Sequence, residues 1–132
     1  MTQYFFADES GDAGLGGHAS SSKHFVIAMV QLPERSPLYP LADLRKTLNL
    51  SPNFEFKYHK TTNAQKDRFF NEAAEIPFRA RVAVLNKIKI GKMFENHSPH
   101  ELIIELIVGL ALRASELDIS NDILIVDGAT PS

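Results

Sequence analysis

The order of apolar and polar residues along the chain predicts an alternation of strands and helices. Apolar runs and period-two alternation predict strands at 4–7, 24–30, 54–59, 78–90 and 123–126. Apolar residues at helical spacing predict helices at 41–48, 63–75 and 99–117. Two helix starts carry a further signal: Thr62 precedes Gln65 by the spacing of a capping box, and Ser98 precedes Glu101 in the same way.

These elements predict an α/β fold built around one mixed sheet. A glycine-containing loop joins the first two strands, which indicates a hairpin, and helices separate the later strands as crossovers. The helix at 99–117 is apolar nearly all round, so we expect a sheet on one side of it and another element on the other. A partner subunit or a further C-terminal element could supply that second cover. No linker interrupts the sequence, so we expect a single domain over 1–132.

Composition agrees with an ordinary globular protein. The chain has 132 residues, of which 44% are hydrophobic and 23% charged. It contains no cysteine, which favours a reducing compartment. The first residues have no basic segment before an apolar core, and the most apolar stretch, 102–112, is shorter than the ~20 residues of a membrane helix. We therefore expect a cytoplasmic protein without a membrane partner.

The charge balance argues against a general attraction to polyanions. Lysine and arginine total 14 and the acidic residues 16, which gives a net charge of −2. Nucleic acid would therefore have to be held by a local basic patch or through metal ions.

Three acidic residues lie on or at the ends of predicted strands: Asp8, Glu55 and Asp127. Asp8 directly follows a buried apolar run, so we expect it at the edge of the core. Carboxylate oxygens suit hard divalent cations, and strand ends of one sheet can bring together residues that are distant in sequence. Each residue also has a structural interpretation. Asp8 and Asp127 could cap turns through hydrogen bonds to the backbone, and Glu55 could form a surface pair with Lys57.

Other chemistry-bearing residues fit less specific patterns. Lys57 and His59 share the predicted face of Glu55, where they could meet a phosphate or remain solvated. His18 and His24 match no dependable zinc spacing, and the glycines of the first loop fit no nucleotide-binding motif. The basic residues between 79 and 92 could follow a phosphate backbone or protect an edge strand from aggregation.

Several motifs resemble a known family. Asp8-Glu9-Ser10-Gly11 ends the first predicted strand, 54–57 contains a Glu-x-Lys motif, and a later apolar strand ends in Asp127. In these features the chain resembles the domain of unknown function 3800 family, whose members look like RNase H-like proteins. The resemblance implies a sheet of about five strands with helices on both faces. It also implies that Asp8, Glu55 and Asp127 bind metal, with Lys57 as the motif lysine.

Members of that family usually continue into a helical region with a further acidic residue, often in an Ala-Asp-Leu context. This chain ends at Ser132. We therefore expect either a truncated product or a natural short form with an incomplete acidic site.

Two functions follow as hypotheses. The first is a nuclease- or phosphodiesterase-like domain acting on nucleic acid, in which Asp8, Glu55 and Asp127 hold Mg²⁺ or Mn²⁺ and Lys57 contacts the phosphate or orients Glu55. The second is a catalytically silent binding or assembly module, as in an accessory protein of a defence or mobile-element system. In that case the apolar helix 99–117 would dock a partner protein or a second copy of the chain.

Overall fold

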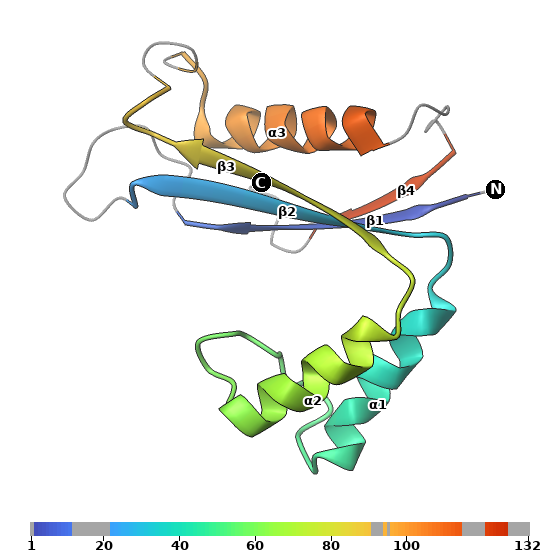
Figure 1. Ribbon diagram of the computed structural model, residues 1–132. Helices are drawn as coiled ribbons and strands as arrows, with labels where there is room; N and C mark the ends of the chain where they lie inside the picture. The colour runs from blue at the N-terminus through green and yellow to red at the C-terminus, as the bar shows by residue number, and fades with distance from the viewer. Residues whose placement is uncertain (1, 12–21, 91–93, 95, 115–120, 127–132) are drawn as a thin grey trace. The chain divides into compact units, whose positions relative to one another are not determined.

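The computed structural model describes residues 2–11, 22–90, 94, 96–114 and 121–126. The chain divides into two compact units, one formed by Met1–Pro33 with Arg79–Ser132 and the other by Glu34–Phe78. The first unit holds a sheet and one helix, and the second holds the remaining helices (Figure 1). That the two units fold as a single domain over 1–132 stays a prediction.

The sheet of the first unit is mixed. Its strands are β1 (Tyr4–Ser10), β2 (His24–Leu32), β3 (Arg79–Asn86) and β4 (Ile123–Val126), in the order β3-β2-β1-β4. β1 and β2 pair antiparallel, as do β2 and β3, whereas β4 lies parallel to β1. The predicted α/β class and the initial hairpin are confirmed. The described residues form four strands in this sheet, against the expectation of about five.

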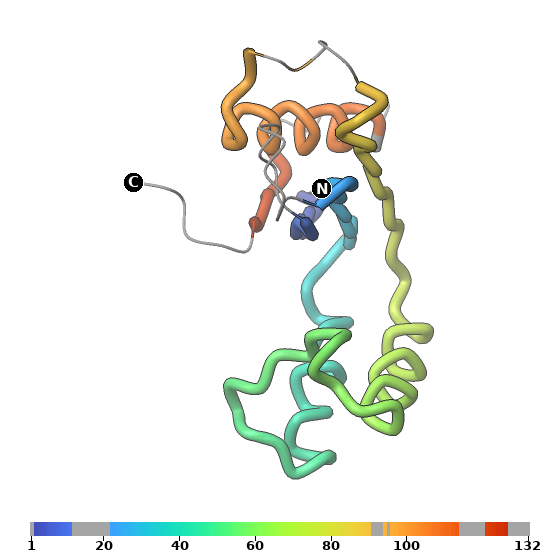
Figure 2. Tube along the Cα trace, turned by 90° about the vertical axis from the view of Figure 1, so that its left-hand side faces the viewer, coloured from blue at the N-terminus to red at the C-terminus, as the bar shows by residue number. Residues whose placement is uncertain are grey.

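One face of the sheet packs against helix α3 (Pro99–Ala114), as two views show (Figure 1; Figure 2). Alternate positions of the strands supply the buried side chains, because successive residues of a strand point to opposite faces. Leu102, Ile107 and Leu110 of α3 meet them. The sheet side of this core comprises Phe5, Ala7, Phe25, Ile27, Met29 and Leu85.

The start of α3 follows the predicted capping box. The Ser98 backbone N–H donates to Glu101 Oε2 over 2.8 Å, and the Glu101 backbone N–H donates to Ser98 Oγ over 3.2 Å. These bonds satisfy two of the donors that a helix start leaves without an intrahelical partner. The local signal therefore fixes the start of the helix that covers the sheet.

The second unit contains the short 3₁₀ helix η1 (Ser36–Leu38), α1 (Tyr39–Thr47) and α2 (Asn63–Ala74). α1 and α2 contact each other, and a reciprocal capping box of Thr62 and Gln65 begins α2. Both helices were predicted within a few residues of their observed bounds. Helices on both faces of the sheet stay a prediction, because α1 and α2 belong to a different unit from the sheet.

The predicted strand at 54–59 is wrong. Residues 54–57 have no regular secondary structure and 58–60 form a turn. The alternation has another cause: the Phe56 ring lies 5.1 Å from the Phe69 ring of α2, while Arg45 Nε of α1 donates to the Phe54 carbonyl oxygen over 2.6 Å. Residues Phe54 and Phe56 thus anchor an irregular loop to two helices. These contacts explain the alternation of aromatic and polar residues without a neighbouring strand.

The strand predicted at 78–90 is shorter in the structure. β3 ends at Asn86, whose side-chain oxygen accepts hydrogen bonds from the backbone N–H groups of Ile88 and Lys89. Such a side chain replaces ladder bonds by a local turn. The apolar alternation continues past Asn86 in the sequence, but the turn prevents the strand from following it.

None of the helices among the described residues is both long enough and apolar enough to cross a membrane.

The core under α3 makes a direct prediction about stability. Leu102 is fully buried, whereas Leu112 on the same helix is 63% exposed. Leu102→Ala should lower the free energy of unfolding by about 2–5 kcal/mol, because it removes buried methyl groups and leaves a cavity. Leu112→Ala should change it by less than about 0.5 kcal/mol. Urea denaturation measures both, and equal losses would contradict the assignment of the core face.

Candidate functional site

Asp8 lies on β1, two residues before the end of the strand. Its side chain is exposed, and its Oδ1 accepts a hydrogen bond from the Glu9 backbone N–H over 2.9 Å. The expectation that Asp8 sits at the buried edge of the core is therefore wrong. Desolvation does not force a partner on this carboxylate, and its exposure leaves it accessible to ions from solvent.

Asp8 lies on the sheet face opposite α3. Phe5 and Ala7 belong to the core under α3, so the alternation of β1 places Phe6 and Asp8 on the other face. Asp8 pairs with Ala28 of β2, which in turn pairs with Val82 of β3. The aspartate therefore stands beside small and apolar residues, away from the buried core.

The backbone conformation of Gly11 explains why the Asp-Glu-Ser-Gly motif ends in glycine. Its φ is 92°, in the left-handed region that favours glycine, and an added Cβ would lie 2.5 Å from the His24 carbonyl oxygen. The chain thus leaves β1 in a backbone conformation that would be strained for any residue other than glycine. This glycine has a backbone role at the end of the strand that carries Asp8.

The parallel pairing of β1 with β4 brings together the strands that precede two of the candidate aspartates. Ala7 lies opposite Val126 in this register. Asp8 follows Ala7 in the sequence, and Asp127 follows Val126. Asp127 itself lies outside the described residues, as do Asp12 and His18.

Glu55 and Lys57 form an ion pair in the second unit. Lys57 Nζ lies 2.9 Å from Glu55 Oε2, and the Lys57 backbone N–H donates to the Glu55 carbonyl oxygen over 2.9 Å. Both side chains are more than half exposed. The hydrogen bond and the charge of Lys57 lower the pKa of Glu55 from its ordinary value. The structure therefore contains the surface ion pair of Glu55 and Lys57, which was one of the two interpretations of the sequence.

The structure brings together only some of the predicted site residues. Glu55 and Lys57 are paired, while Asp8 belongs to the other unit. Within the described ranges, no three His, Asp or Glu side chains form a group that could hold a metal ion. His24 is exposed at the start of β2 and His59 is exposed in the turn before α2.

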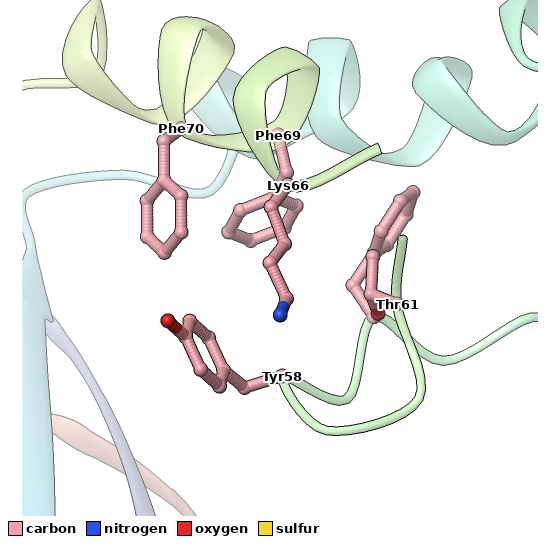
Figure 3. Close-up of a pocket in the computed structure, with 6 residues that line it drawn as sticks. Tyr58, Thr61, Lys66, Phe69 and Phe70 are labelled. Carbon is pink, nitrogen blue, oxygen red and sulfur yellow. The ribbon is translucent and has the colours of Figure 1, made fainter. Parts of the chain in front are cut away.

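The sequence did not single out an aromatic pocket in the second unit. It has a volume of about 70 Å³ and is lined by Phe56, Tyr58, Thr61, Lys66, Phe69 and Phe70 (Figure 3). Phe70 of α2 is exposed although it lines the pocket. Adjacent residues on a helix point about 100° apart, so the Phe69-Phe70 pair was itself the signal that one ring would face outward.

Comparison with protein-family models found no match, and neither did comparison with curated proteins or with solved structures.

The ion pair predicts a change in the titration of Glu55. Lys57→Gln should raise the pKa of Glu55 towards its ordinary value, because the substitution removes the charge and the main hydrogen-bond donor. In the unmodified protein the pair should be lost only as the pH falls through the lowered pKa. Carboxyl NMR chemical shifts followed against pH measure both effects.

Glu101 supplies the control for this titration. Its pKa is lowered mainly by the Ser98 backbone N–H, so Lys57→Gln should leave it unchanged. An unaltered Glu55 pKa in the variant would show that Lys57 does not control the carboxylate.

Proposed function

We propose that the chain is a divalent-metal-dependent nuclease- or phosphodiesterase-like domain of RNase H-like fold that acts on nucleic acid. The observation that carries this proposal is the parallel register of β1 and β4, with Ala7 opposite Val126. Pairing that continued by one residue would set Asp8 beside Asp127, since neighbouring strands lie about 4.8 Å apart. Two carboxylates at that separation can share one divalent cation.

The sheet supports the RNase H-like part of the proposal. It begins with an antiparallel hairpin, and α3 then connects β3 to β4, which lies parallel to β1. These are the initial hairpin and the later helical crossover that the sequence pattern predicts. The Asp-Glu-Ser-Gly motif falls at the end of β1, the position expected of it.

The donor set also suits the proposed ion. Asp8 is exposed, and carboxylate oxygens are the ligands that Mg²⁺ and Mn²⁺ prefer. A bound ion would supply an activated water and stabilise negative charge on the phosphate. A role for Glu55 and Lys57 in this site stays a prediction, because their ion pair belongs to the second unit and Asp8 to the first.

A second candidate function is a catalytically silent assembly module. It is favoured by an exposed apolar stripe on α3, formed by Ile104, Val108 and Leu112 at a spacing of four residues. Beside it, the edge strand β4 has the uncharged sequence Ile-Leu-Ile-Val and lacks the charges or proline that usually protect an edge. A partner protein or a second copy would cover both features.

Metal binding tests the proposed function. Isothermal titration calorimetry should show Mn²⁺ binding to the unmodified chain and its loss in Asp8→Asn, which keeps the shape of the side chain but removes its charge. Glu9→Gln is the matched control, because Glu9 is the adjacent exposed acid on the same strand. It should bind as the unmodified chain does.

Two outcomes would count against the metal site. Equal Mn²⁺ affinity in Asp8→Asn and the unmodified chain would remove Asp8 from it. Absence of binding in every variant would favour the assembly module.

A further inference from the structure

Two exposed aromatic rings, one from the loop before α2 and one from α2 itself, lie at one pocket. Tyr58 is 71% exposed and Phe70 is 55% exposed, and both line the pocket of the second unit. Phe56 and Phe69 form its inner wall, with ring centroids 5.1 Å apart. The inner rings anchor the loop to the helix, whereas the outer two keep faces in contact with water.

The pocket is positively charged at its centre. Lys66 Nζ lies 3.9 Å from the centroid of the Tyr58 ring, and Figure 3 shows the lysine reaching from α2 towards that ring. This cation–π contact holds an ammonium group among the aromatic side chains. A cationic ligand such as a methylated lysine is therefore disfavoured, because the protein's own cation already occupies the ring face.

The sequence that forms the pocket also carries an excess of positive charge, which favours an anion. Between Phe56 and Phe70 the chain carries four basic residues and one acidic residue, although its net charge overall is −2. The basic residues are Lys57, Lys60, Lys66 and Arg68, and the acidic one is Asp67. Lys57 is paired with Glu55, so the remaining excess lies with Lys60, Lys66 and Arg68.

Hydrogen bonds fix the loop that presents Tyr58. Thr61 is buried and its hydroxyl donates to the Lys57 carbonyl oxygen over 2.6 Å, while the Lys60 backbone N–H donates to the same oxygen over 2.9 Å. Thr62 then caps α2. The exposed ring is thus held in place before any ligand arrives, which lowers the entropic cost of binding.

We propose that this pocket binds single-stranded nucleic acid, with an unpaired base stacked on Phe70 and on the face of Tyr58 opposite Lys66, and the adjoining phosphate drawn to Lys66. Exposed aromatic rings next to basic side chains are how proteins hold single strands, because every base has a flat face and every nucleotide a charge. The pocket has room for about two water molecules, so the base lies against the outer rings and is not enclosed. This site lies entirely within the second unit and needs no metal ion.

Fluorescence anisotropy with labelled oligothymidylate and oligouridylate, in the presence of EDTA, tests the proposal on the full chain. Tyr58→Ala and Phe70→Ala should each weaken binding by about 5- to 150-fold, the effect of losing one stacked base. Circular dichroism should show both variants folded, since neither ring is buried. Lys66→Gln should weaken binding and flatten its dependence on salt.

Two controls separate stacking from general charge attraction. Tyr39→Ala removes a tyrosine of α1 that is 67% exposed but does not line the pocket, and it should bind normally. An abasic phosphodiester chain of equal charge should bind much more weakly than either oligonucleotide. Because the assay contains EDTA, it does not depend on the proposed metal site, so failure of the metal site and failure of the pocket can be told apart.

The proposal would be overturned by no binding to the unmodified chain or by normal binding in both pocket variants. Equal affinity for the abasic chain would also overturn it, because the rings would then contribute nothing. A preference for thymidylate or uridylate would identify DNA or RNA as the better ligand of the same pocket.

Discussion

The burial of one sheet face under α3 is the constraint on which the first unit depends. α3 connects β3 at one edge of the sheet to β4 at the other, and Leu102 and Ile107 share one core with side chains of β1, β2 and β3. A helix that crosses the sheet in this way returns the chain for a parallel strand, which a tight turn cannot do. The packing of α3 therefore sets β4 beside β1, and the proposed metal site derives from that pairing.

Two features of the first unit take no part in this core. The face of the sheet opposite α3 carries Asp8, and the outer side of α3 carries its apolar stripe. Burial explains neither, because these side chains contribute little to the core. Exposed carboxylates and exposed apolar stripes add nothing to the stability of the fold or lower it. They are therefore the candidate binding surfaces of the first unit.

Much of the fold could be predicted from local signals. Continuous apolar runs located β1, β2 and β4, and the capping boxes at Thr62 and Ser98 fixed the starts of α2 and α3. These signals succeed because their physical causes, burial and the satisfaction of helix-end donors, act over a few residues.

The failures have a different origin. Residues 54–59 alternate as a strand does, but their aromatic rings pack on α2, a contact that no local pattern specifies. Asp8 was expected at the edge of the core, yet the alternation of β1 turns it to the exposed face. The ion pair of Glu55 and Lys57 could be anticipated from spacing alone, whereas the association of Glu55 with Asp8 depends on tertiary structure and stays a proposal.

The proposed metal site requires that the ends of β1 and β4 together hold a divalent cation. Anomalous diffraction from a crystal of the full chain grown with Mn²⁺ is a direct test, because it locates the ion and both carboxylates at once. We expect an anomalous peak coordinated by Asp8 and Asp127. Carboxylates separated by more than about 8 Å, too far for a shared ion, would contradict it.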